Sequence, residues 1–163
     1  MTLEMDFIPH DEHTAFLSAA IALASSARKN GNHPFGAVLV LNGSVLLRAE
    51  NTVSTLNDAT NHAEMNLVRQ ATQALSPNER ELAILYTSTE SCVMCAGAIY
   101  WSGIRTVVFA CSVATLAKHA TGSFAVPCQE IFSRGRFPTR AIGPLLEAEA
   151  ERDHASFWKQ KLR

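Results

Sequence analysis

The sequence lacks a surplus of charge of either sign. Its 163 residues contain 14 Lys and Arg against 15 Asp and Glu, which gives a formal net charge of −1. A protein that binds nucleic acid tightly usually carries a basic surface, so the composition argues against a nucleic-acid partner. Charged residues make up only 18% of the chain and hydrophobic residues 47%. This balance is typical of a globular fold and excludes a disordered chain.

A membrane-spanning run and a secretion signal are also missing. The most apolar stretch, Phe16 to Ala27, is too short to span a bilayer and is typical of a buried helix. Met1 to Glu12 contains acidic residues and Pro9, but no basic segment followed by an apolar one. We therefore expect a cytoplasmic protein with no membrane partner.

Cysteine is scarce, with four residues in the whole chain. A secreted disulfide framework is excluded, because two of the four cysteines fall in a Cys-x-x-Cys motif and the other two stand alone. Internal repeats, linkers and low-complexity segments are absent as well. A chain of this length fits one domain with a sizeable core, so we expect a single domain over residues 1–163.

Hydrophobic periodicity and turn residues predict an α/β fold. Asn42-Gly43 between two apolar runs is typical of a two-stranded antiparallel hairpin. A strand, helix, strand unit over 82–110 favours parallel pairing with a right-handed crossover, so the sheet is expected to be mixed. The predicted helices cover 16–27, 62–75, 92–102, 113–118, 127–133 and 144–161, and the predicted strands cover 36–41, 44–50, 82–86, 106–110 and 140–142.

The chain does contain a compact set of metal ligands. His62 and Glu64 stand two residues apart, and Cys92 and Cys95 stand three apart, a spacing that puts two thiols on one face of a helix. The positive end of a helix favours the thiolate ligand. A Cys₂His set leaves one zinc position open for water, which zinc activates at neutral pH. We predict one zinc ion on His62, Cys92 and Cys95, with Glu64 moving the protons and Asn61 capping the helix that follows.

A closed structural zinc site is the alternative, and it needs four nitrogen or sulfur ligands. The remaining candidates have no partner at ligand spacing, so we expect them to be core or surface residues: Cys111, Cys128, His33 and His119. A non-catalytic binding module that zinc merely stabilises also stays open at this point.

The order of the motifs matches a known pattern. His-x-Glu followed by Cys-x-x-Cys is the signature of zinc deaminases, in which proline precedes the first cysteine. Here Ser91 stands in that place. Serine is a good helix-capping residue, so we expect Ser91 to cap the helix that carries the two cysteines.

From Ala15 to Leu146 the chain resembles the cytidine-deaminase-like superfamily, and in particular its guanine deaminase and tRNA adenosine deaminase branch. The resemblance implies a three-layer α/β/α sandwich with a central five-stranded mixed sheet, a homodimer, and one zinc per chain with Glu64 as acid and base. The strings that carry it are Pro34-Phe35-Gly36-Ala37-Val38, Asn51-Thr52-Val53, His62-Ala63-Glu64-Met65-Asn66 and Cys92-Val93-Met94-Cys95-Ala96-Gly97-Ala98-Ile99-Tyr100-Trp101.

The resemblance also implies contacts to a base from Phe35, Asn51, Ala63 and Trp101. An amide offers a donor and an acceptor together, and aromatic faces stack on bases. Bacterial guanine deaminases tend to carry an acidic pair followed by Phe-Ile-Tyr after the fourth strand, whereas this chain reads Ala120-Thr121-Gly122-Ser123-Phe124-Ala125-Val126. Another purine, a pyrimidine, a triazine or a nucleoside therefore stays open as substrate. Candidates for the missing acid are Glu130, Glu147 and Glu149.

Together these features predict zinc-dependent hydrolytic deamination of a small aminated nucleobase or nucleoside, with a guanine-like base first and ammonia as product. The alternative is a tRNA-specific adenosine deaminase. The tRNA enzymes carry a Lys-Thr-Gly-Ala-Ala-Gly-Ser stretch, which this chain matches only in part at Ala120-Thr121-Gly122-Ser123. The Tyr100-Trp101 pair suits the free-base branch better.

Overall fold

The computed structural model describes residues 10–161 and contains one five-stranded mixed sheet in the strand order β2-β1-β3-β4-β5. β1 pairs antiparallel with β2 and β3, while β3, β4 and β5 run parallel to one another. The elements are α1 (His10–Lys29), β1 (Gly36–Leu41), β2 (Ser44–Glu50), α2 (Val53–Leu56), α3 (Ala63–Ala74), α4 (Pro77–Leu82), β3 (Ile84–Thr89), α5 (Val93–Ser102), β4 (Thr106–Cys111), α6 (Val113–Ala117), α7 (Cys128–Ser133), β5 (Arg140–Ile142) and α8 (Glu147–Lys161).

The predicted hairpin between β1 and β2 is confirmed. Asn42 and Gly43 both have positive φ angles, 50° and 73°. A two-residue turn with positive φ at both positions has the twist that matches paired strands, and Asn-Gly adopts it at low cost. The pairing then runs from Leu41 opposite Ser44 to Gly36 opposite Glu50.

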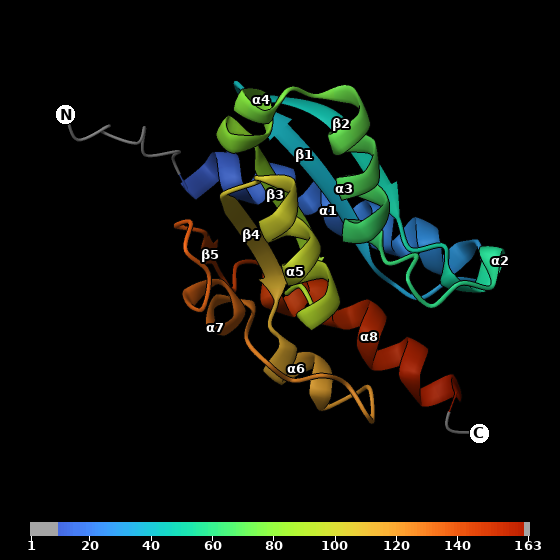
Figure 1. The fold of residues 1–163 in the computed structure, drawn as a ribbon. Helices are drawn as coiled ribbons and strands as arrows, with labels where there is room; N and C mark the ends of the chain where they lie inside the picture. Colours follow the sequence, from blue (N-terminus) through green and yellow to red (C-terminus); the bar gives the residue numbers. More distant parts are fainter. Residues whose placement is uncertain (1–9, 162–163) are drawn as a thin grey trace.

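Helices cover both faces of the sheet, which confirms the predicted three-layer sandwich (Figure 1). The alternation of side chains along β1 shows the division: Ala37 and Leu39 pack in a core with α3, α5 and α7, while Val38 and Val40 pack in a second core with α1 and α8. All four of these side chains are at most 2% exposed. A strand buried on both faces explains why this run is continuously apolar rather than alternating.

Helix α1 lies very close to the start of β1. A Cβ atom on Gly36 would stand 2.4 Å from the carbonyl oxygen of Ala20 and 2.6 Å from the amide nitrogen of Ala24. Only glycine fits this approach. The buried face of α1 therefore packs directly against the backbone of β1 at Gly36.

Some predictions about local structure were wrong in detail. The region 51–60, which lies outside every predicted helix and strand, contains the short helix α2, and the predicted strand start at residue 82 falls in α4. Ser76 and Glu79 form a complete capping box at the start of α4, and this helix delays the start of β3 to Ile84. The caps predicted at Asn61 and Ser91 are also wrong, because His62 and Cys92 occupy the N-cap positions of α3 and α5.

The chain segments that carry the motifs lie together at one edge of the sheet. β3 and β4 run parallel and end there, at Thr89 and Cys111, while the antiparallel β1 begins there at Gly36. α3 and α5 start beside the same edge (Figure 1). Ligands of open α/β sheets bind outside the carboxyl ends of the parallel strands, so this edge is the expected place for a site. Within residues 10–161, no helix combines the length and apolar character needed to cross a membrane.

Candidate metal centre

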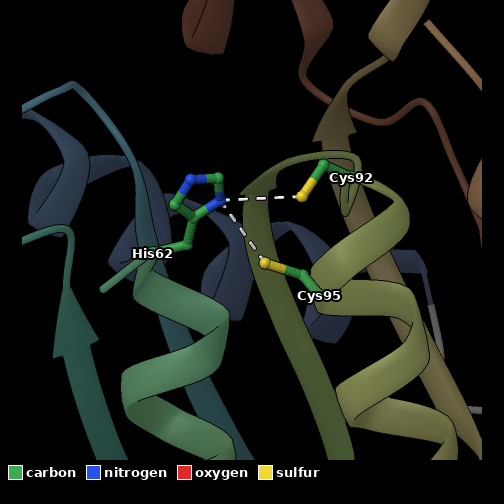
Figure 2. Close-up of side chains that lie close together, drawn as sticks. All are labelled: His62, Cys92 and Cys95. Atoms are coloured by element: carbon green, nitrogen blue, oxygen red, sulfur yellow. Dashed lines mark hydrogen bonds between the residues drawn. The ribbon is translucent and has the colours of Figure 1, made fainter. Parts of the chain in front are cut away.

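His62, Cys92 and Cys95 converge on one point between α3 and α5 (Figure 2). Nδ1 of His62 lies 3.6 Å from Sγ of Cys92 and 3.5 Å from Sγ of Cys95, and all three ligand atoms lie within 4.8 Å of one another. A tetrahedral zinc ion with bonds of about 2.0–2.3 Å separates its ligand atoms by about 3.3–3.8 Å. The donor set and its spacing therefore fit one zinc ion.

The backbone at the helix starts aims these side chains. His62 and Cys92 are the N-cap residues of α3 and α5, both in an extended conformation, and neither makes a side-chain capping bond. Their side chains are consequently available as ligands. Cys95 lies one turn further along α5 and is fully buried. Two helix N-termini thus point at the metal position and stabilise anionic ligands there.

The thiols and the imidazole perturb one another. The pKa of Cys92 is lowered to about 4, chiefly because it accepts a hydrogen bond from the Cys95 thiol and also because it interacts with His62. The pKa of Cys95 is raised because Cys92 holds its proton in that bond and because it is buried. The hydrogen bond to Cys92 raises the pKa of His62. This is the behaviour of a ligand set that concentrates negative charge, which a bound cation neutralises.

Glu64 lies beside the cluster but is not part of it. It is 4% exposed, and its Oε1 accepts hydrogen bonds from the hydroxyls of Thr87 at 2.9 Å and Ser91 at 3.4 Å. Burial raises the pKa of the Glu64 carboxyl, and the negative charge at Cys92 raises it further. A carboxyl with a raised pKa can both accept and deliver protons near neutral pH. Ser91 therefore contacts this carboxylate in place of the predicted capping role.

A cavity of about 600 Å³ opens over the cluster. Its inner side is lined at the starts of α3 and α5, and its outer side by residues of α6, of the segment after α6 and of α8. It is lined by His33, Phe35, Ala59, His62, Glu64, Glu90, Cys92, Val93, Met94, Val113, Leu116, Ala120, Thr121, Gly122, Ser123, Phe124 and Trp158. The lining is mostly apolar with a few polar groups, as in pockets for small molecules.

Two of the predicted substrate contacts lie at the pocket edge of the sheet. Phe35 lines the cavity, and its ring is parallel to that of His62, with 6.5 Å between the ring centres. Asn51 is fully buried just after β2, and its Oδ1 accepts the amide of Val53. Its Nδ2 has no hydrogen-bond partner within residues 10–161. Asn51 is not itself in the cavity lining, but its backbone amide donates to the carbonyl of Phe35, which is. A buried amide nitrogen left unpaired is a donor for a ligand that reaches it.

The other two predicted contacts lie elsewhere. Ala63 is buried in the core as the first residue of α3 and does not line the cavity. Trp101 is 82% exposed on α5, and among the aromatic residues described its ring contact is a T-shaped one with Tyr100. In the single chain, neither side chain reaches the pocket.

Several pocket residues carry no local sequence signal. Phe124 and Trp158 come from the C-terminal third, and only the packing of that third against the sheet brings them to the cavity. His33, expected to be a core or surface residue, lines the cavity too. An acid directly before the cysteine motif could have suggested Glu90. The acids considered instead are not in the cavity lining: Glu130, Glu147 and Glu149.

Comparisons with known proteins agree with this geometry. The family model described as the cytidine and deoxycytidylate deaminase zinc-binding region matches residues 10–111. A probable cytosine deaminase of Schizosaccharomyces pombe is 38% identical over 154 residues, which cover 91% of this chain and 93% of that protein. The guanine deaminase of Bacillus subtilis is 42% identical over 99 residues, which cover 60% of this chain and 64% of that protein.

A solved structure from work on tRNA A34 deaminases, which edit adenosine to inosine at the wobble position, superimposes with a TM-score of 0.70. It is 32% identical, and the match covers 86% of this chain and 99% of that one. The predicted fold class and the predicted zinc ligand triad are both confirmed by these likenesses.

Proposed function

The chain belongs to the cytidine and deoxycytidylate deaminase zinc-binding family, and from this premise we propose that its single domain removes the exocyclic amine of a free nucleobase by hydrolysis. A guanine-like base is the first candidate, and ammonia is the second product. The observation that carries the proposal is the position of Glu64, a buried carboxyl in the wall of a cavity and next to a three-ligand metal centre. A purely structural zinc site has no use for such a group.

The proton transfers fall to Glu64. Zinc bound by the triad supplies Lewis-acid activation of a water molecule at neutral pH. Glu64 takes a proton from this water as the new C–O bond forms, and it protonates the ring nitrogen beside the reacting carbon. Glu64 then takes the second proton of that water, now on the hydroxyl of the tetrahedral carbon, and delivers it to the amine, which leaves as ammonia as the C–N bond breaks and the C=O bond forms. The hydroxyls of Thr87 and Ser91 hold the carboxyl in place during these transfers.

Asn51 and Phe35 supply the recognition of the base. The unpaired Nδ2 of Asn51 donates to a carbonyl oxygen or ring nitrogen, while its Oδ1 is fixed by Val53. A site built around an unpaired buried donor discriminates against ligands that cannot accept from it. The ring of Phe35 provides a flat apolar wall parallel to the imidazole of His62. These contacts favour a planar base that carries an acceptor.

Cytosine is the second candidate, because the cytosine deaminase relative aligns over more of the chain than the guanine deaminase relative does. The cytosine deaminase relative aligns over 91% of the chain, whereas the guanine deaminase relative aligns over 60%. The pocket lining contains two carboxylates, Glu64 and Glu90, and both oxygens of Glu90 already accept backbone amides. Among the described residues, the lining therefore offers no further carboxylate for the donor edge of guanine.

A tRNA substrate is the remaining alternative, and the tRNA A34 deaminase structure supports it. A net charge of −1 speaks against strong binding to a polyanion. Binding that depends on phosphate contacts weakens steeply as salt rises, so a salt titration with tRNA separates this alternative from the free-base proposal.

The proposed contact from Trp101 and the proposed homodimer depend on each other. Trp101 is 82% exposed and outside the cavity of its own chain. It can contact a base only if a second copy places it over the pocket of the first. Substitution of Trp101 by alanine should then weaken self-association and substrate binding together.

A substrate panel tests the proposal. The zinc-loaded protein is incubated with guanine, cytosine, adenine, aminated triazines, the matching nucleosides and tRNA, and ammonia release is measured. We expect kcat/KM for one free base to be at least about tenfold higher than for its nucleoside. A substrate that leaves buried polar groups of the site unpaired is bound much more weakly. Activity confined to tRNA contradicts the proposal, as does ammonia release from no member of the panel.

A further inference from the structure

Glu90 occupies the pocket wall but belongs neither to the metal ligands nor to the proton shuttle. It directly follows β3 and stands two residues before Cys92, and its side chain is 7% exposed. Its backbone amide donates to the carbonyl of Cys111 at 2.7 Å, which fixes it to the end of β4. The position of its carboxylate is therefore set by the same sheet edge that carries the metal centre.

Both oxygens of this carboxylate accept backbone amides from distant segments. Oε2 accepts from Val113 at 3.0 Å, and Oε1 accepts from Cys128 at 2.9 Å. Val113 is the first residue of α6 and Cys128 the first residue of α7. The amides at a helix start have no partner inside the helix, so each is satisfied here by one oxygen of Glu90. Bonds of this charge-assisted kind are stronger than neutral ones.

The two amides are the two ends of one stretch of chain, residues 113–128. This stretch forms most of the outer side of the cavity, through Val113, Leu116, Ala120, Thr121, Gly122, Ser123 and Phe124. Two further anchors tie its first part to α8. Ser112 donates to Glu147 through its amide and its hydroxyl, and His119 pairs with Glu151 at 2.7 Å.

We propose that Glu90 is a positioning residue that holds both ends of segment 113–128 and so sets the distance between the outer wall of the pocket and the metal ligands. The kinetic part of this inference rests on the proposed deaminase function, while the structural part does not. Substrate fit is then controlled by a residue in the loop that also carries Cys92. The glutamate side chain suits the role because one carboxylate offers two acceptors at once.

Hydrogen–deuterium exchange on the zinc-loaded protein tests the structural part. An amide side chain has one acceptor oxygen and one donor nitrogen. Glu90→Gln therefore loses at least one of the two bonds and places its NH₂ group next to a backbone N–H. We expect amides in 113–128 to exchange about tenfold faster or more, with α3 changed by less than about twofold. Unchanged exchange in 113–128, or an equal rise throughout the protein, overturns the proposal.

Glu147→Gln is the matched control. Glu147 anchors the start of the same helix, but both of its bonds from Ser112 go to the single oxygen Oε1. Glutamine keeps that oxygen as an acceptor, so the same substitution should leave the exchange of 113–128 within about twofold of wild type. If Glu147→Gln raises exchange in 113–128 as much as Glu90→Gln does, Glu90 has no special role in holding the segment.

A second variant covers the case in which Glu90→Gln does not fold. Proline is tolerated at the first position of a helix, where the amide has no helical partner. Cys128→Pro removes the amide bond to Oε1 of Glu90 together with the buried Cys128 thiol, so Cys128→Ala, which keeps the amide, is its control. We expect faster exchange confined to the far part of the segment, near Phe124 and Cys128. Exchange equal to that of wild type would show that the bond does not hold the wall.

Kinetics with the substrate found in the panel complete the test. We expect Glu90→Gln to raise KM about tenfold while kcat changes by less than about threefold and zinc stays at one per chain, because a displaced wall weakens binding more than the proton transfers. A loss of kcat at unchanged KM overturns the proposal. If no substrate is found, the exchange result still decides the structural claim, so failure of the function and failure of this inference are distinguishable.

Discussion

The two sides of the pocket are built in different ways. The inner side contains His62, Glu64 and Cys92 and is backed by the buried Cys95, and all four come from two short motifs at the starts of α3 and α5. The outer side consists of segment 113–128 and Trp158, which reach the cavity only because the C-terminal third packs against the sheet. The reaction chemistry is thus encoded locally, while the shape that selects a substrate depends on contacts between distant parts of the chain.

The family match follows the same division. It covers residues 10–111, which include the whole inner side together with Phe35 and Asn51, and it stops before the outer side begins. The chain aligns both with a relative named for cytosine and with one named for guanine. This explains why the zinc chemistry of the chain is established by likeness and the choice of base is not.

Removal of an inner ligand should have the largest effect. Cys92→Ala leaves two protein ligands, and we expect zinc affinity to fall by more than about 10²-fold, since loss of a mere outer partner already costs about 10–100-fold. Activity and melting temperature should fall together, because metal binding is coupled to folding. Elemental analysis and thermal unfolding measure this.

Cys111→Ala is the control for that prediction, because Cys111 is also a buried free cysteine but lies outside the ligand cluster. It should keep one zinc per chain. Retention of full zinc by Cys92→Ala would show that the ligand assignment is wrong.

Truncation of the outer wall should have a smaller effect of a different kind. Trp158→Ala removes an aromatic face from the cavity, and base stacking is typically worth about 1–3 kcal/mol. We expect KM to rise about tenfold with kcat nearly unchanged and zinc retained. Phe137→Ala, at an exposed aromatic residue outside the cavity lining, should leave both constants unchanged. A fall in kcat alone for Trp158→Ala would place the outer wall in the chemistry and end the division between the two sides.

The smallest predicted effect concerns acid stability and His154, a residue of α8 that supports the outer wall. His154 is 1% exposed, contacts Thr89 and Trp158, and has its pKa lowered to about 4, chiefly by burial. The unfolded chain binds this proton near pH 6.5 and the folded chain does not, so stability falls as pH falls through that range.

Between pH 7 and pH 5.5 this group should cost about 1 kcal/mol of unfolding free energy. Chemical denaturation of wild type and His154→Gln at both pH values isolates the contribution of His154 from that of the other histidines. Equal pH dependence in the two proteins would mean that His154 is not buried in its neutral form.

The parts of the fold that sequence predicts well are those with a strong local cause. The Asn42-Gly43 turn determines the β1–β2 hairpin, and the strand, helix, strand order determines the parallel β3–β4 pair. The short helix α2 was missed because it lies in a polar stretch that favours a loop, and α4 was missed because Ser76-Pro77-Asn78 is also typical of a helix end. The capping box at Ser76 and the proline at the first helical position, Pro77, are the signals that could have revealed α4.

The same reasoning applies to the site. The reactive residues are predictable because each motif holds its residues within one helical turn: His62 and Glu64, and Cys92 and Cys95. Phe124 and Trp158 are not, because their places depend on long-range packing. Glu90 stands beside the cysteine motif, but its contacts with Val113 and Cys128 depend on the fold. The capping roles expected for Asn61 and Ser91 were wrong for a related reason: both helices begin one residue later, at positions that the metal ligands themselves occupy as N-caps.

The central claim is that Glu64 is a proton shuttle beside a catalytic zinc, and Glu64→Gln tests it most directly. Glutamine keeps the shape and the acceptor for Thr87 but cannot carry protons. General acid–base catalysis is typically worth about 10²–10⁴-fold, and Glu64 serves several transfers in each turnover, so we expect kcat to fall by about 10⁴-fold or more. Zinc content and melting temperature should stay unchanged. Ammonia release at a rate near that of wild type would contradict the account, and loss of zinc would make Glu64 a ligand of a closed structural site.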